Sequence, residues 1–254
     1  MVAAGAALAQ NAAVADGGVL NAASYARGSA VSAGSLVAIF GTNLASGLAQ
    51  AGSIPLSTSL GDVQSVKFNG TNAPLLFVSG GQINAQIPWE TPAGSVSVVV
   101  RRNGVDSAPV TFQTAEFSPG IFSLSGTGEG QGVVVNNADG SIAAPSGSVP
   151  GLAAHPARAG DALIIYANGL GPVSPAPTTG NSSTDQLRST INPVTVLIGG
   201  VQAQVLFSGL APQFVGVNQV NVVVPQGVTA GNAVPLQIRM GSVTSTDKLT
   251  IAIQ

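Results

Sequence analysis

The fold is indicated by a stretch that occurs twice, AGSLVAIFGTNL at residues 33–44 and AGDALIIYANGL at residues 159–170. In each copy a glycine precedes a run of aliphatic residues that ends in an aromatic residue. A short apolar run that follows a turn is typical of a strand in the core of a β-sandwich. The sequence therefore predicts two equivalent strands, one in each half of the chain.

Two later pairs extend the repeat in the same order. Residues 66–77 match residues 196–207, and residues 82–88 match residues 219–225. Three matches in one order indicate a domain that was duplicated and then acquired loop insertions.

Turn dipeptides mark the expected hairpins. Asn69-Gly70 follows residues 66–68, and Asn-Gly is a strong hairpin signal because both residues tolerate a positive φ. We expect residues 75–78 to return as the partner of this strand. Asn103-Gly104 marks a second hairpin, and residues 199–200, both glycine, repeat the first one.

Strands are expected every ~8–12 residues, and no segment keeps a helical period. We therefore predict an all-β chain of two tandem immunoglobulin-like β-sandwich domains. The predicted division is a tail or signal-peptide remnant at residues 1–18, a first sandwich at 19–125 and a second at 126–254. Residues 176–190, rich in Pro, Thr, Gly and Ser, are predicted to form a long exposed loop.

Composition excludes several classes of partner. Only 7% of the residues are charged, against ~25% in an average protein, and the net charge is −2. Without a Lys/Arg cluster, the electrostatic signature of nucleic-acid binding is missing. The chain has no cysteine, which excludes disulfides and thiolate sites. No run approaches the ~18 apolar residues of a membrane span.

The N-terminus resembles the end of a signal peptide. Residues 1–10 are small and apolar and include Ala7-Leu8-Ala9, the A-x-A form of a cleavage site. We therefore expect a secreted or cell-surface protein. A disordered, alanine-rich tail is the alternative interpretation of these residues.

Several short strings carry a resemblance to a known family: NAASY, GTNL, GQINAQIP, SPGIF and GLGPV, at residues 21–25, 41–44, 81–88, 118–122 and 169–173. With them the chain resembles, from about residue 19 to its end, the Solibacter-type C-terminal domain of exported acidobacterial proteins. The resemblance implies export and β-sandwiches similar to IPT/TIG domains. It brings no catalytic residues with it.

The sequence contains few residues that could form a catalytic site. The single histidine, His155, lies in a predicted loop, and no Gly-x-Ser-x-Gly motif is present. A zinc site needs three or four ligands, and the ten acidic residues are scattered. Residues 136–141 resemble a calcium loop only faintly, and we interpret them as a hairpin turn. We expect no enzyme activity, no cofactor and no metal site.

The repeated Gln-x-Asn segment is the candidate binding site. In a strand, Gln82, Asn84 and Gln86 share one face, and Gln219 and Asn221 repeat most of it. The amides either satisfy backbone groups at a sheet edge or domain junction, or bind glycans with Trp89 or Tyr25 stacked on a sugar ring. The candidate binding residues are Gln82, Asn84, Gln86, Trp89, Gln219 and Asn221.

Three functions remain open. The first is a non-catalytic secreted or cell-surface module for adhesion, spacing or assembly, with other surface proteins or extracellular polysaccharide as partners. The second is a carbohydrate-binding module. The third is a self-assembling filament subunit in which residues 10–20 are donated as a strand.

Overall fold

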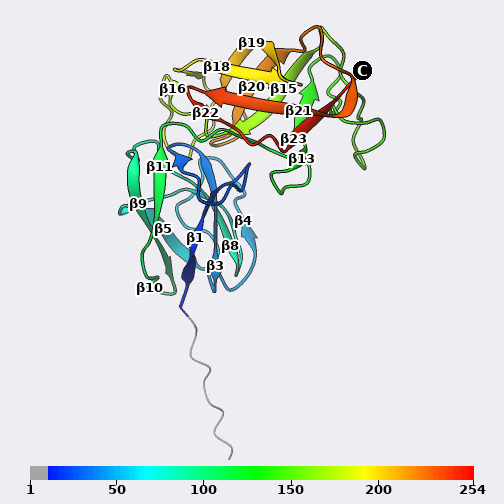
Figure 1. Cartoon of the computed structure of the whole chain (residues 1–254). Helices are drawn as coiled ribbons and strands as arrows, with labels where there is room; N and C mark the ends of the chain where they lie inside the picture. The colour runs from blue at the N-terminus through cyan, green and yellow to red at the C-terminus, as the bar shows by residue number, and fades with distance from the viewer. Residues whose placement is uncertain (1–10) are drawn as a thin grey trace, which may run out of the picture.

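The structure is a computed structural model that describes residues 11–254, and these residues form strands and loops without any helix. Two β-sandwiches follow one another along the chain, one below the other in Figure 1. The predicted all-β architecture of two tandem immunoglobulin-like sandwiches is confirmed. The predicted cleavage site falls within residues 1–10, outside the described residues. None of the described residues belongs to a helix that could span a membrane.

The first sandwich has two layers. The first layer has the order β1 (Ala13–Asn21), β3 (Leu36–Thr42), β8 (Gln82–Gln86), β7 (Leu75–Val78) and β4 (Ala49–Gln50). The second layer has the order β2 (Val31–Ser32), β11 (Val110–Ala115), β9 (Gly94–Arg102), β5 (Val63–Phe68) and β6 (Thr71–Asn72), with β10 (Val105–Asp106) on β9.

The second sandwich is one continuous set of paired strands. Its order is β12 (Gly120–Ile121), β15 (Ala162–Asn168), β20 (Asn218–Val223), β19 (Val201–Leu210), β18 (Val194–Ile198), β21 (Gly231–Met240), β23 (Leu249–Ile253) and β13 (Gly130–Gln131). Four short strands flank this path: β14 (Val134–Asn136), β16 (Val173–Ser174), β17 (Ser189–Thr190) and β22 (Val243–Thr244).

The two sandwiches repeat one topology. Strands β1-β3-β8-β7 correspond to β12-β15-β20-β19, and β11-β9-β5 correspond to β23-β21-β18. Even the parallel edge strand recurs, because β2 runs parallel to β11 as β13 runs parallel to β23. The duplication in the sequence is therefore a duplication of strand order.

The strand that follows the first hairpin crosses between the layers in both copies, which corrects the predicted hairpin partner. β19 pairs with β18 through residues 201–203 and with β20 through residues 204–210, so it joins the two layers. In the first sandwich Pro74 stands at the position of Gln204, and a proline cannot donate a ladder hydrogen bond. The strand is split there into β6 and β7. Residues 75–78 pair with β8 in the opposite layer, and not with β5 as predicted, just as residues 204–210 pair with β20 in the second copy.

The turns follow their sequence signals. Asn69 and Gly70 have φ of 46° and 86° and connect β5 to β6, where Phe68 pairs with Thr71. Residues 103–104 connect β9 to β10, and residues 199–200 connect β18 to β19, both with positive φ. These local predictions are confirmed because a left-handed turn needs residues that tolerate it.

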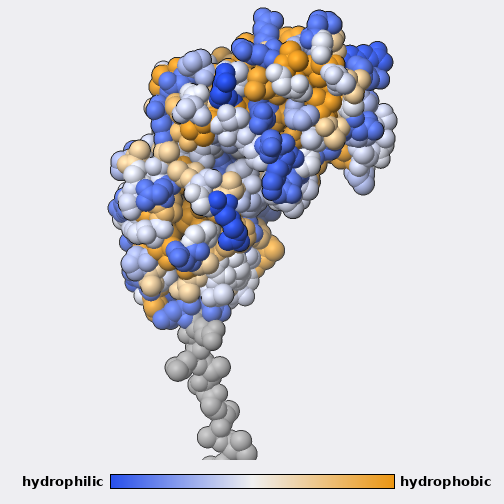
Figure 2. Space-filling model, viewed as in Figure 1, coloured by the Kyte–Doolittle hydropathy of each residue, from blue (hydrophilic) through white to orange (hydrophobic). Residues whose placement is uncertain are grey.

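Each sandwich has its own aliphatic core. In β9 the side chains of Val96, Val98 and Val100 are fully buried, whereas the residues between them are partly exposed. This period of two directs one face of each strand inward. Figure 2 shows the other consequence of the composition, a surface on which pale and hydrophobic areas alternate and strongly hydrophilic residues are scattered.

The paired strands do not begin and end at the predicted segment limits. β1 begins at Ala13, within the segment assigned to the N-terminal tail, and pairs with β3. The chain leaves the first sandwich after Ala115 and enters the second at Gly120, ahead of the boundary placed after residue 125. The division at that boundary stays a prediction.

The two sandwiches are joined by buried amide side chains. Asn168 donates from Nδ2 to the carbonyl oxygen of Leu36 at 2.8 Å and accepts from the Leu36 amide at 3.0 Å. It also donates to Asn21 Oδ1 at 3.0 Å, and Asn21 Nδ2 donates to Ser118 O at 2.7 Å. Asn168 is 0% exposed and Asn21 is 2% exposed.

A second connection comes from the loop at residues 176–190, which was predicted to be exposed. Gly180 donates from its amide to Gln86 Oε1 at 2.8 Å, and its carbonyl accepts from the Leu56 amide at 2.9 Å. Ser183 and Arg188 are 5% exposed, so part of the loop is buried. The prediction is wrong for these positions because the loop lies there against the second sandwich: the Ser183 amide donates to Pro212 O at 3.1 Å, and the Leu210 amide donates to Arg188 O at 3.0 Å.

Candidate functional site

The repeated amides form the same pair in both sandwiches. In β8, Gln82 Nε2 donates to Asn84 Oδ1 at 2.7 Å. In β20, Gln219 Nε2 donates to Asn221 Oδ1 at 2.9 Å. All four side chains are partly exposed on the outer face of their sheet, since the residues between them point into the core. The pair holds each amide in one orientation toward solvent.

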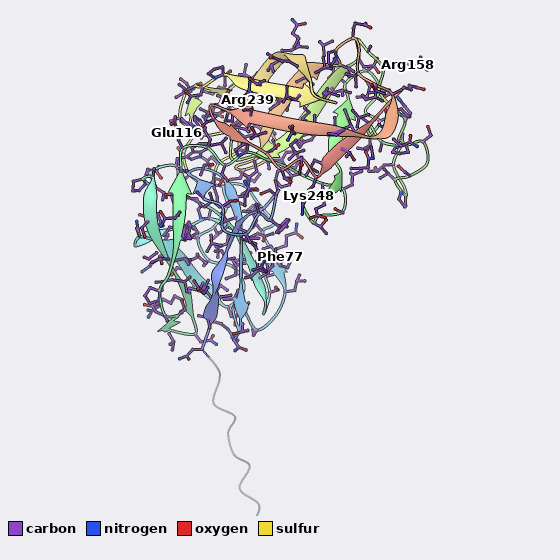
Figure 3. The ribbon with its side chains drawn as sticks, in the orientation of Figure 1. Phe77, Glu116, Arg158, Arg239 and Lys248 are labelled. Carbon is purple, nitrogen blue, oxygen red and sulfur yellow. The ribbon has the colours of Figure 1, made fainter. Side chains whose placement is uncertain are left out.

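Aromatic residues flank each amide pair at equivalent positions. Phe40 lies opposite Gln82 and Phe77 opposite Asn84. Residues opposite each other across two strands point to the same face of the sheet. We call Phe40, Phe77, Gln82 and Asn84 the first amide–aromatic cluster. Phe77 is labelled on the flank of the lower sandwich in Figure 3.

The second amide–aromatic cluster consists of Tyr166, Phe207, Gln219 and Asn221. Tyr166 lies opposite Gln219, and Phe207 lies opposite Asn221. A β-bulge precedes both Phe77 and Phe207, so the backbone irregularity is repeated as well.

A further aromatic ring packs on each cluster. Tyr25 lies 6.3 Å from Phe40 between ring centroids, and Phe214 lies 6.1 Å from Tyr166. Burial raises the pKa of Tyr25, so its hydroxyl stays neutral over the physiological range. The clusters therefore offer ring faces, hydroxyl and amide groups without charge.

Gln86 lies apart from the exposed pair. It is 0% exposed, donates to Gly34 O at 3.1 Å and accepts from the Gly180 amide at 2.8 Å. Both ends of its amide are therefore used inside the protein. This matches the alternative in which amides satisfy backbone groups at the domain junction.

Trp89 also lies at the junction. A Cβ on Gly34 would come within 2.3 Å of the indole ring, so the ring lies directly against the Gly34 backbone. The Trp89 amide donates to Thr179 Oγ1 at 3.1 Å. Its Nε1 is buried without a hydrogen-bond partner among the described residues. The structure places this ring in a packing position between the sandwiches.

His155 is brought together with an acid and a serine. Its Nε2 lies 2.9 Å from Asp139 Oδ2 and 2.8 Å from Ser141 Oγ, and its Nδ1 lies 3.0 Å from Pro156 O. Ser141 Oγ donates to Asp139 Oδ1 at 2.6 Å. A serine, a histidine and an acidic residue are also the three members of a hydrolytic catalytic triad.

The arrangement differs from that of a triad. A catalytic base uses one ring nitrogen for the nucleophile and the other for the acid, whereas here Nε2 contacts both. The carbonyl of Pro156 and the carboxylate of Asp139 raise the pKa of His155. Hydrogen bonds from Ser141 and His155 hold the pKa of Asp139 well below its ordinary range. A protonated ring that bonds a carboxylate cannot accept a proton from Ser141.

The segment at residues 136–141 is a turn closed by its own side chains. Asn136 Oδ1 accepts from the Ala138 amide at 3.1 Å, and Asp139 Oδ1 accepts from the Ser141 amide at 2.9 Å. Among residues 11–254, the structure contains no group of three acidic or histidine side chains placed to hold a metal ion.

The aromatic members of the clusters were missed as site residues. Their signal was in the repeat, because Phe40 and Tyr166 end the apolar runs of the first matched pair, and Phe77 and Phe207 end the second pair. Whether these aromatic side chains share a sheet face with the repeated amides can be decided only when the register of the neighbouring strands is known.

These features define a chain of two fused immunoglobulin-like β-sandwiches with one amide–aromatic cluster on each. Residues 20–118, most of the first sandwich, match the model of the IPT/TIG domain. No curated protein matches the chain.

Three solved structures have a low overall similarity to the chain. The Bacteroides ovatus mixed-linkage glucan utilization locus SGBP-B, in complex with a mixed-linkage heptasaccharide, is 13% identical with a TM-score of 0.35, over 89% of this chain and 42% of that one. The BSP domain of a biofilm associated protein is 15% identical with a TM-score of 0.28, and the match covers 86% of this chain and 27% of that one. The plexin A4 extracellular region is 10% identical with a TM-score of 0.27, and the match covers 96% of this chain and 18% of that one. The chain thus spans less than half of each structure.

Proposed function

We propose that this chain is a non-catalytic module of a secreted or cell-surface protein, which holds two sandwiches in a fixed arrangement for adhesion, spacing or assembly. The buried junction carries the proposal. Asn168 and Gln86 have both ends of their amides bonded across or beside it, and they are fully buried. Buried amides that lose partners when the domains separate favour one orientation.

Supporting contacts surround these amides. Gly216 packs on the first sandwich so closely that a Cβ there would come within 2.9 Å of Gly34 O. Glu116, labelled between the sandwiches in Figure 3, accepts from Asn192 Nδ2 at 3.1 Å. A spacer needs such contacts because relative motion is the usual behaviour of domains joined by a small interface.

Small-angle X-ray scattering tests this role. We expect the purified chain to scatter as one rigid body, with a profile that fits the structure and does not change with salt. Asn168→Ala should broaden the distribution of interatomic distances, whereas Asn137→Ala, an exposed asparagine, should leave it unchanged. A flexible profile for the unmodified chain would refute the spacer role. Protease treatment of intact cells, followed by detection of the chain, tests its location at the surface.

A second candidate function is carbohydrate binding, and the duplicated clusters favour it. Each combines two aromatic rings with an oriented Gln–Asn pair on an exposed sheet face. Ring faces pack against the C–H faces of sugars, and amides hydrogen-bond to sugar hydroxyls. Two such clusters in one rigid chain would bind a polymer with greater avidity than either alone.

Retention on insoluble polysaccharides tests this candidate. We expect Asn84→Ala and Asn221→Ala to weaken retention separately and to abolish it together. Trp89→Ala is a control, since it should act through stability and not through contact with ligand. Equal retention of the double variant and the unmodified chain would contradict binding by the clusters.

Two finer proposals concern origin and assembly. The strings shared with the Solibacter-type domain support kinship with that family of exported proteins. In the filament alternative, β1 would be donated to a neighbouring subunit, although in this structure it pairs with β3 of its own chain. Deleting residues 10–20 tests the alternative, and an unchanged monomer after the deletion would remove it.

A further inference from the structure

Three surface recesses lie next to one another at the domain junction, and we call them together the groove. The first, about 450 Å³, is lined by Gln50, Ile54 and Leu76 of the first sandwich and by Gln213 and Phe214 of the second. The second, about 400 Å³, shares Phe214 with it and continues along Tyr166 and Phe122. The third, about 310 Å³, shares Ile54 and continues along Thr178 and Ser182 to Arg188. Phe214 and Ile54 are 49% and 46% exposed.

Both walls of the groove are held by backbone hydrogen bonds. On the first sandwich, the Ala51 amide donates to Leu76 O at 2.9 Å, and the Leu56 amide donates to Gly180 O at 2.9 Å. On the second, the Ala211 amide donates to Val217 O at 2.9 Å and closes the loop that carries Phe214. A groove with fixed walls binds without a large ordering cost.

The lining is apolar and amidic, with its charge compensated. The residues that line the first two recesses include no charged side chain. In the third, Arg188 makes a two-point ion pair with Asp185, at 2.6 Å and 3.0 Å, so the two charges compensate each other. Such a lining offers no unpaired charge to offset the desolvation of an anion or a cation, so it favours a neutral ligand.

This chemistry distinguishes a sugar polymer from a peptide. An extended peptide would bind through main-chain hydrogen bonds to a free strand edge. The wall that carries Phe214 is a loop between β19 and β20, and on the other wall the edge strand β4 has only two residues, too few for a ladder with a peptide. Aromatic rings at intervals, with amides and hydroxyls between them, instead suit pyranose rings whose rims carry hydroxyls.

We propose that the groove through Phe214 and Ile54 binds a single strand of a neutral polysaccharide. The proposal deepens the carbohydrate-binding candidate and rests on it. It assigns the contact to the domain junction, so that both sandwiches touch one strand, and it makes the fixed orientation of the sandwiches a condition of binding. Tyr166 belongs both to the second cluster and to the groove, and the groove therefore reaches that cluster.

Affinity electrophoresis of the whole chain tests the groove. The gels contain a soluble β-glucan, xyloglucan or galactomannan, with polygalacturonate as an acidic counterpart. We expect retardation by at least one neutral polymer and none by polygalacturonate. Phe214→Ala and Ile54→Ala should each weaken binding roughly tenfold, because each removes a contact face without emptying a core. Leu152→Ala is the matched control, since Leu152 is 58% exposed and does not line the groove.

Each other outcome overturns the proposal in a different way. If Phe77→Ala and Phe207→Ala abolish retardation while Phe214→Ala does not, the clusters bind sugar and the groove does not. If none of the neutral polymers retards the chain, both the groove and the carbohydrate candidate fail, whereas the spacer role still depends on the scattering result. If polygalacturonate binds more tightly than the neutral polymers, or if extended apolar peptides selected against the chain require Phe214, the assigned ligand is wrong.

Discussion

Asn168 bonds to the backbone of Leu36 as a neighbouring strand would, accepting from its amide at 3.0 Å and donating to its carbonyl at 2.8 Å. The two residues lie in β15 and β3, the equivalent strands of the two copies. At the matching position of the first copy the residue is Thr42. One side chain thus distinguishes the second copy from the first and joins the two.

Removal of this amide should destabilise the protein. Asn168→Ala leaves the buried Leu36 amide without its partner and takes a donor from Asn21. Each unsatisfied buried group costs about 1–3 kcal/mol, so we expect a loss of about 2–4 kcal/mol in the free energy of unfolding. Urea denaturation measures it. Asn137→Ala should cost less than about 0.5 kcal/mol. Equal losses in the two variants would contradict the role of Asn168.

Gln86 should control the loop that contains Gly180. Gln86→Leu removes the acceptor of the Gly180 amide, so this amide should exchange its hydrogen faster in hydrogen–deuterium exchange. We expect the exchange at residues 176–188 to increase while the exchange in β20 stays unchanged. Gln82→Leu, at the partly exposed other end of the same strand, is the control. Unaltered exchange at Gly180 in Gln86→Leu would refute this connection.

Trp89 should report on the packing of the junction by fluorescence. It is the single tryptophan of the chain, and a Cβ on Gly34 would overlap its ring at 2.3 Å. Gly34→Ala should therefore displace the indole into water, shift its emission to the red and cost about 2–3 kcal/mol.

Gly28→Ala is the control for the backbone strain in Gly34→Ala. Gly28 has a φ of 73°, close to the 74° of Gly34, but nothing lies within 4 Å of the position of a Cβ. We expect a cost of about 1 kcal/mol and an unchanged emission spectrum. A red shift in both variants would mean that strain, and not the contact with Trp89, is responsible.

His155 should titrate above its ordinary pKa of 6.5, since Pro156 O and Asp139 favour the protonated ring. A group whose pKa is raised by folding stabilises the protein at low pH, and this contribution is lost as pH rises through the folded pKa. The pKa of Asp139 is lowered, so its own contribution is lost as pH falls. The single histidine makes an NMR titration unambiguous.

Asp139→Asn should lower the pKa of His155 toward 6.5, because the negative charge that favours the protonated ring is removed. Glu129→Gln, at a different surface ion pair with Lys248, is the control and should leave this pKa unchanged. An unchanged pKa in Asp139→Asn would mean that the Pro156 carbonyl alone perturbs the ring.

Local features of the fold could be predicted because they depend on neighbouring residues. Asn69-Gly70 and Asn103-Gly104 form tight turns because their residues tolerate a positive φ. In β9, the alternation of residues along the strand determines which side chains are buried. The partner of residues 75–78 could not be predicted in the same way. It depends on where the chain crosses from one layer to the other, and this crossing occurs in both copies, after Pro74 in the first and at Gln204 in the second.

The junction could not be predicted because it joins residues that are far apart in the sequence. Nothing near Gln86 or Trp89 indicates that they meet the loop around Gly180, and an exposed sugar-binding tryptophan has the same local sequence as a packed one. Gln82, Asn84, Gln219 and Asn221 were placed on sheet faces by periodicity. The hydrogen bond within each Gln–Asn pair is seen only in the structure. To predict which aromatic residues lie opposite the amides, one must know the register of three neighbouring strands.

The way in which the chain enters and leaves the first sandwich has a mechanical consequence. In Figure 1, β1 begins at the lower end of this sandwich and the connection to the second one leaves from its upper end. Tension along the long axis would pull β1 past β3 in the direction of the strands, so that the hydrogen bonds between Ala13–Asn21 and Leu36–Thr42 bear the load together. Strands loaded in shear resist force better than strands peeled apart one bond at a time, so we expect the first sandwich to resist extension along this axis.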